Sequence, residues 1–256
     1  MKYAVLFVLS VLCVGGAAAQ QALTPLDITQ LFAEANQAYR ETRYEQAAQL
    51  YEQIIAAGYT TADMYFNAGN AYYKSGALGK AILKYRIAHL RAPRDEDVQM
   101  NLTYALEQTK DKIECPDTYR LLAQLCFWYD LMSQGELCGA FLIANLFVWL
   151  ILTVRQVRSH EMLTIALAIC LFATILFGAS FGVKAYAMHI TPEGVVTAPE
   201  ITVRAGTSVS DTVLFKLHEG TSFTWKEETD GWVKIELCDG KKGWVQKDMV
   251  GKVSLS

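Results

Sequence analysis

The sequence predicts a multidomain membrane protein that joins an all-α repeat domain, a two-helix transmembrane hairpin and a small all-β barrel. Three observations support this prediction: a 34-residue repeat near the N-terminus, two long apolar runs without charges, and short alternating strands near the C-terminus. Hydrophobic residues make up 52% of the 256 residues and charged residues 19%. This balance is apolar for a soluble protein and is typical of folded domains joined to membrane segments.

Charge and cysteine usage exclude two classes of partner. The formal net charge is −3 and no long basic run is present, whereas nucleic-acid binding needs a clustered basic face. The six cysteines contain no CxxC pair and match no zinc spacing, so we expect no metal. Most should be small buried hydrophobic side chains. Four of them could oxidise after export, without any pairing set by spacing: Cys115, Cys126, Cys138 and Cys238.

Residues 1–19 are typical of a secretory signal peptide. A lysine precedes an apolar core at 4–14, and three alanines at 17–19 form a small-residue cleavage site. The core is too short to span a bilayer. A lipoprotein attached through Cys13 is the alternative, but the residues before it make a poor lipobox. We therefore expect the chain after residue 19 to be exported.

The segment 24–114 contains the internal repeat. A shift of 34 residues aligns Ala35-Asn36 with Gly69-Asn70. This period is the tetratricopeptide signature, in which antiparallel helix pairs stack and small residues recur where two helices approach closely. The same shift aligns Tyr39 with Tyr73, Ala47 with Ala81, and Tyr51 with Tyr85.

Five helices are expected in this domain. Four form two repeats, and Pro93 ends the second repeat. The fifth should cap the array, because its acidic start at 95–97 suits the positive end of a helix dipole. The expected ranges are about 27–41, 44–57, 61–75, 78–90 and 95–112.

A repeat stack of this kind binds partners on a concave face formed by the first helix of each pair. Asn36 and Asn70 occupy positions at which related domains clamp a peptide carboxylate. Phe32, Met100 and Tyr104 stand where such a clamp needs basic residues. We therefore expect general peptide or protein binding in place of carboxylate clamping. The predicted contact residues are Asn36, Tyr39, Arg40, Asn70, Tyr73 and Lys74.

Two uncharged runs, 137–154 and 162–183, should be transmembrane helices. At 1.5 Å per residue they reach roughly 27 and 33 Å, close to the thickness of the hydrocarbon core. The short link between them predicts a hairpin; a buried core helix is the alternative. Arg155 and Arg158 in the link favour the cytoplasmic side, although Lys184 weakens the asymmetry. Together with the export signal, this predicts an inner-membrane protein whose two terminal domains are periplasmic.

Small and polar residues within these runs suggest how the helices pack. Asn145 lies in the first run, and Gly178 and Gly182 form a small-xxx-small pair in the second. Packing within the hairpin is expected, with self-association as the alternative. The aromatic segment 115–136 before the first run should be a linker helix at the membrane interface, or else a plain packed linker.

Residues 190–256 should form the barrel. Glu219-Gly220, Asp230-Gly231 and Asp239-Gly240 separate short alternating runs at 200–204, 221–225, 232–237 and 243–245. The order V-R-A-G, L-x-E-G-T, D-G-W-V-K-I and D-G-x-x-G-W-V resembles bacterial SH3 domains over about 195–253. Four aromatic residues could form a ligand groove, although the last two could instead fill the core: Phe215, Trp225, Trp232 and Trp244.

The sequence contains no nucleotide-binding, zinc-protease or kinase motif, and its histidines are scattered. Gly178-Ala-Ser180-Phe-Gly182 fits the G-x-S-x-G hydrolase pattern. It lies inside an apolar run, where the strand-turn-helix setting of a nucleophile elbow cannot form. We therefore expect no enzyme, no catalytic residue and no cofactor.

The order of these segments resembles the BatE family of Bat aerotolerance operons over essentially the entire chain. Asp111-Lys-Ile-Glu114 before Pro116, and the string from Val196 to Arg204, support the resemblance. It implies partners: Bat membrane proteins with von Willebrand A domains, a further tetratricopeptide protein and, indirectly, a MoxR-type ATPase. The expected function is a scaffold of a Bat-like envelope complex linked to aerotolerance or stress. The alternative is an anchor that binds peptidoglycan through the SH3 domain.

Overall fold

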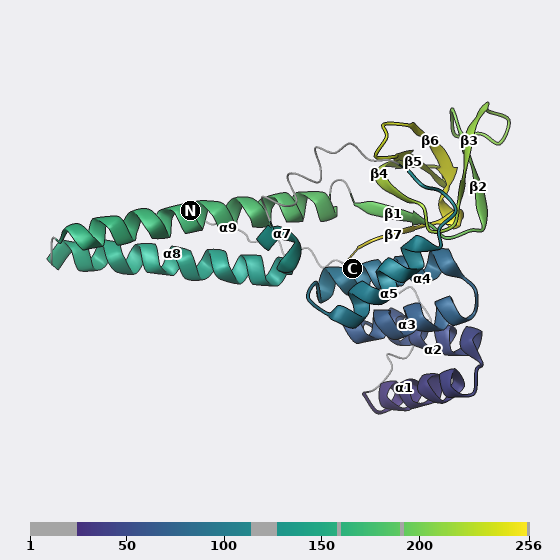
Figure 1. Cartoon of the computed structure of the whole chain (residues 1–256), viewed down its shortest axis with the longest axis horizontal. Coiled ribbons are helices and arrows are strands. Elements are labelled where there is room, and N and C mark those ends of the chain that lie inside the picture. The colour runs from purple at the N-terminus through teal and green to yellow at the C-terminus, as the bar shows by residue number, and fades with distance from the viewer. Residues whose placement is uncertain (1–24, 114–126, 158–159, 190–191, 255–256) are drawn as a thin grey trace, which may run out of the picture.

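The computed structural model describes residues 25–113, 127–157, 160–189 and 192–254 (Figure 1). A stack of helices lies against a seven-stranded barrel, and a long two-helix hairpin extends to one side. The predicted signal peptide lies outside the described residues. So does most of the predicted interfacial linker, of which the structure describes the short helix α7 (Phe127–Leu131).

The N-terminal region is helical, as expected. Thr61 caps one helix by accepting a hydrogen bond from Met64 N, and Asp95 caps another by accepting from Val98 N at 3.1 Å. The last helix ends at Glu107, earlier than the predicted 112, because the following residues run to the barrel. The helices are α1 (Pro25–Arg40), α2 (Tyr44–Ala56), α3 (Ala62–Lys74), α4 (Leu78–Arg91) and α5 (Glu96–Glu107).

The 34-residue period is visible in the packing. Small residues at equivalent places are fully buried between helices, and the tyrosines Tyr51 and Tyr85 are each 2% exposed. Each tyrosine occupies the same place in its own pair of helices. The equivalent buried small residues are Ala35 and Gly69, and Ala47 and Ala81.

The barrel is an all-antiparallel sheet in the order β3-β2-β6-β5-β4-β1-β7. The strands β1, β3 and β7 were not among the runs expected from the sequence. Strand β1 begins at Glu193 and pairs with β4 and β7. The strands are β1 (Glu193–Val196), β2 (Glu200–Arg204), β3 (Val213–His218), β4 (Ser222–Thr229), β5 (Trp232–Glu236), β6 (Lys242–Gln246) and β7 (Val250–Lys252), with the 3₁₀ turn η1 (Lys247–Met249) before β7.

Strands β1 and β7 close the C-terminal end of the helical stack. Val195 and Val253 are buried in the same apolar cluster as Ile82 of α4 and Ala105 of α5. The approach is close: a Cβ atom at Gly251 would lie 2.2 Å from Leu83 Cδ2. The barrel therefore packs where a repeat array would continue with another helix, and the two domains are not separate modules.

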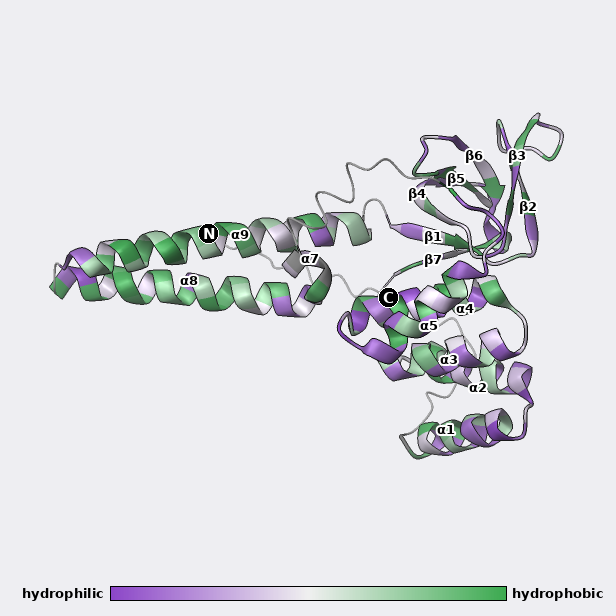
Figure 2. Ribbon diagram, in the orientation of Figure 1, coloured by the Kyte–Doolittle hydropathy of each residue, from purple (hydrophilic) through white to green (hydrophobic). Residues whose placement is uncertain are grey.

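Helices α8 (Gln134–Val157) and α9 (Glu161–His189) are long and apolar enough to cross a membrane, and they pack as an antiparallel hairpin (Figures 1 and 2). Phe141 packs on Gly178, whereas Gly182 has open space around its Cα. Only the first glycine of the predicted pair thus lies in the hairpin contact. Lys184 is buried and donates to the carbonyl oxygens of Tyr129 and Met132, so it ties α7 to α9.

Candidate functional site

The predicted contact residues of the helical region share a recurring geometry. Tyr51 donates a hydrogen bond from its hydroxyl to Asn36 Oδ1 at 2.7 Å, and Tyr85 donates to Asn70 Oδ1 at the same distance. Burial raises the pKa of Tyr51 to about 12, so the phenol remains a donor at neutral pH. Each carboxamide oxygen therefore accepts from a tyrosine of the neighbouring helix, and each asparagine remains half-buried.

The other predicted residues lie beside these asparagines. Arg40 and Lys74 are exposed at the ends of α1 and α3, whereas Tyr39 and Tyr73 are half-buried. Tyr39 makes an edge contact with Tyr44, with ring centroids 5.3 Å apart. The asparagines are therefore partly structural, while the two cations are free to meet a partner.

A third member of this row comes from α5, which the sequence analysis treated as a plain cap. Asn101 Nδ2 donates to Asn70 Oδ1 at 2.9 Å, and the rings of Tyr104 and Tyr73 meet edge to face at 5.8 Å. The pattern Asn-x-x-Tyr, present at 36–39 and 70–73, recurs at 101–104 and would have predicted this. Met100 and Tyr104 are 62% and 57% exposed, so the row ends in an open apolar patch.

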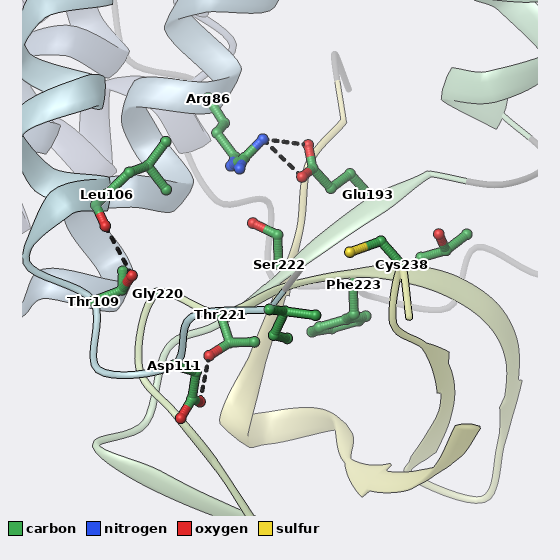
Figure 3. Close-up of a pocket in the computed structure, with 12 residues that line it drawn as sticks. Arg86, Leu106, Thr109, Asp111, Glu193, Gly220, Thr221, Ser222, Phe223 and Cys238 are labelled. Carbon is green, nitrogen blue, oxygen red and sulfur yellow. Dashed lines mark hydrogen bonds and ion pairs between the residues drawn. The ribbon is translucent and has the colours of Figure 1, made fainter. Parts of the chain in front are cut away.

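A second candidate site is a cavity of about 480 Å³ at the junction of the helical stack and the barrel (Figure 3). Arg86 of α4 forms an ion pair with Glu193 of β1 on one side, at 2.7 Å. Asp111 and Thr221 meet on the other side, and Ser222 lies between the two pairs in the view. None of these residues was predicted to belong to a site, because the residues of each pair are far apart in sequence.

Asp111 forms the most completely satisfied polar contact at this junction. Its carboxylate accepts hydrogen bonds from His218 N at 2.7 Å, His218 Nδ1 at 2.8 Å and Thr221 Oγ1 at 2.7 Å. Burial acts to raise the pKa of Asp111, but the hydrogen bonds from Thr221 and His218 outweigh it and hold the pKa below its ordinary value. This carboxylate joins the two domains, and its partners leave it little capacity for a ligand.

The remaining polar groups of the cavity are less well satisfied. Arg86 Nε and Ser222 Oγ are buried without a hydrogen-bond partner in the described part of the chain. Such atoms normally meet a water molecule or another polar group. The cavity can therefore hold small polar molecules. In the described residues, no group of three or more His, Cys, Asp and Glu side chains could hold a metal ion.

The barrel separates the four aromatic residues predicted to form a groove. Trp225 belongs to the barrel core and Phe215 packs against it. Trp244 lies opposite Lys234 across β5 and β6, with the ammonium 5.6 Å from the ring centroid. Trp232 is 9% exposed and lies on the same side of β5 as Lys234, because strand residues alternate between faces. The structure thus divides the four residues between the interior and the outer surface.

Comparison with known proteins identifies the barrel. Residues 199–251 match the bacterial SH3 domain family, from just before β2 to the second residue of β7. No curated protein matches the chain. The protein therefore combines a helical N-terminal region, two apolar helices compatible with a membrane hairpin and a bacterial SH3 domain.

Proposed function

We propose that this protein is a non-catalytic adaptor of the bacterial envelope, anchored in the inner membrane by α8 and α9. It binds protein segments through the row of asparagines and tyrosines on α1, α3 and α5. Hydrogen bonds and an ion pair connect the two domains through Asp111, Arg86 and Glu193. Such connections are suited to a rigid support. The helical stack and the SH3 domain also share one buried apolar cluster.

The observation that carries this proposal is the fixed orientation of Asn36 and Asn70. Their Oδ1 atoms accept from buried tyrosines, and in the described part of the chain their Nδ2 atoms have no partner. An oriented amide donor is suited to the backbone carbonyls of a peptide. The exposed Tyr104, which contacts Tyr73, adds an aromatic side chain of the kind common in interface hot spots. The exposed Lys74 adds a positive charge.

Placement of both terminal domains outside the cytoplasm has its own support. Cys238 of the SH3 domain is disulfide-bonded, and stable disulfides are typical of oxidising compartments such as the periplasm. Arg155 lies in the last turn of α8, next to the short link that leads to α9. A hairpin returns the chain to the side from which it entered, so the stack and the SH3 domain share one side.

The partners we propose are those implied by the resemblance to BatE proteins. They are Bat-like membrane proteins with von Willebrand A domains and a further tetratricopeptide protein, with a MoxR-type ATPase reached indirectly. The role in aerotolerance or stress is part of the same proposal.

Purification of the tagged full chain from gently solubilised membranes tests this function. Lys74→Glu combined with Tyr104→Ala should reduce recovery of von Willebrand A proteins, identified by mass spectrometry, by at least about tenfold. Lys80→Glu, an exposed charge reversal on α4, is the matched control and should leave recovery unchanged. Equal recovery with the wild type, the double variant and the control would show that the asparagine–tyrosine row does not bind the partner.

A second candidate function is cell-wall binding by the SH3 domain. Val209, Val213 and Leu214 expose apolar surface around the β2–β3 connection, and Leu214 reaches Gly243, beside Trp244. Cosedimentation of the detergent-solubilised full chain with purified peptidoglycan tests it. Binding lost in Trp244→Ala and kept in Lys241→Ala would favour this function over protein binding alone.

A further inference from the structure

Helix α8 carries a polar side chain that the hairpin does not satisfy. Asn145 lies near the middle of α8, and no side chain or backbone group in the described residues hydrogen-bonds its carboxamide. Thr153 and Thr174, by contrast, donate to carbonyl oxygens of their own helices at 2.9 and 2.8 Å. An unpaired amide is unfavourable in hydrocarbon because no water is available to replace the missing bonds.

Asn145 is half-buried and is not among the fully buried residues of α8. The buried side of α8 is formed by Leu137, Ala144 and Val148, with Phe141 packed on Gly178. Residues seven apart lie on one stripe of a helix, which places Cys138 and Leu152 in line with Asn145. Two exposed residues complete this stripe, so that its members are Cys138, Leu142, Asn145, Trp149 and Leu152.

We propose that this stripe is the surface through which two copies of the chain associate within the membrane, with the two Asn145 carboxamides hydrogen-bonded to each other. A carboxamide is both donor and acceptor, so two identical groups related by a two-fold axis satisfy one another with two hydrogen bonds. The inference rests on the membrane hairpin of the proposed function.

A second copy fits this stripe better than an unrelated membrane helix. Two copies inserted in the same orientation bring their Asn145 residues to the same depth without any further requirement. An unrelated helix would need its own polar group at that depth. A single asparagine within an apolar heptad stripe is a known device for setting the register and number of associating helices.

The native Cys138 provides a direct test. It is a free thiol on the same stripe, two helical turns from Asn145. In membranes from a Cys170→Ser background, a copper-phenanthroline oxidant should link Cys138 to Cys138 of a second copy. Asn145→Leu should lower the linked fraction about tenfold, and Asn145→Gln should retain most of it.

Two controls separate this surface from general contact in the membrane. Thr174→Val removes a polar group whose hydroxyl is already satisfied within α9, so it should not change the linked fraction. Moving the thiol off the stripe, with Cys138→Ser and Ile143→Cys, should abolish the link, because Ile143 lies on a different side of α8.

Alkaline carbonate extraction, carried out first, distinguishes failure of the membrane anchor from failure of this inference. Release of the chain from the membrane would overturn the anchor and the proposed function with it. If the chain resists extraction, an unlinked Cys138, an unchanged link in Asn145→Leu, or a link to a different protein would overturn the association of two copies.

Discussion

The hydroxyl of Tyr85 in α4 donates to the carboxamide oxygen of Asn70 in α3 at 2.7 Å, although only 2% of the tyrosine is exposed. The same bond joins Tyr51 to Asn36 one 34-residue period earlier. The bond holds the two helices of a pair together and at the same time orients the asparagine amide.

Asn70→Ala is expected to destabilise the protein by about 1–3 kcal/mol, because it leaves the buried Tyr85 hydroxyl without an acceptor. Thermal unfolding of the full chain in detergent would show the loss as a lower midpoint. Tyr85→Phe in the Asn70→Ala background should recover part of it, since the unsatisfied hydroxyl is then gone. A double variant as unstable as the sum of the single variants would argue against this coupling.

The junction between the stack and the SH3 domain should weaken in acid through Asp111. The hydrogen bonds from Thr221 and His218 lower the folded-state pKa of Asp111 below its unfolded value of about 3.9. The resulting stability is present above about pH 4 and is lost as the pH falls through the folded pKa. The midpoint difference between wild type and Asp111→Asn should therefore be constant at neutral pH and shrink below pH 4. If the difference in unfolding midpoint is the same at pH 2 as at neutral pH, the charge of Asp111 does not contribute to it.

Gly251→Val should separate or destabilise the two domains. A Cβ at this position would lie 2.2 Å from Leu83 Cδ2, so β7 and α4 would have to move apart. We expect faster limited proteolysis of the full chain and a lower unfolding midpoint. Gly135→Ala is the control, because nothing lies within 4 Å of the added Cβ. Identical digestion of both variants would show that the junction tolerates the added volume.

Both terminal domains should be labelled from the periplasm. In a Cys138→Ser, Cys170→Ser background, Ser210→Cys in the β2–β3 connection should react with a membrane-impermeant maleimide in intact spheroplasts. His160→Cys in the hairpin link should react only after lysis. Both introduced thiols lie at exposed positions, so the difference reports sidedness. The reverse pattern would invert the orientation predicted from the arginines and the export signal.

Local signals in the sequence were sufficient for the main elements. Charge-free apolar runs predicted α8 and α9, and the strings around Gly220 and Trp244 predicted a bacterial SH3 domain, which the family match confirms. The helical character of the N-terminal region is confirmed, whereas its assignment as tetratricopeptide repeats stays a prediction. The resemblance to BatE also stays a prediction. These predictions succeeded for one reason: periodicity and turn residues are local signals that depend on a few neighbouring residues.

Candidate sites were harder to predict because they depend on which face a residue occupies. Phe215, Trp225, Trp232 and Trp244 are all aromatic, but the alternation of residues along each strand places them on different sides of the sheet. Asn36 and Asn70 were placed correctly on the first helix of each pair, yet their bonds to Tyr51 and Tyr85 cross between helices. Spacing alone cannot show that a polar side chain is already engaged.

The kinds of element and their order along the chain follow from local patterns in the sequence: helices, an apolar hairpin and a small barrel. The docking of the barrel on the stack is visible only in the folded chain, where Asp111 meets His218 across 107 residues and β7 packs on Leu83. Such contacts arise from complementary shape and paired polar groups, brought together when the chain between them closes a long loop. No local sequence pattern predicts these contacts, because the groups on each domain find their partners only when the other domain is in place.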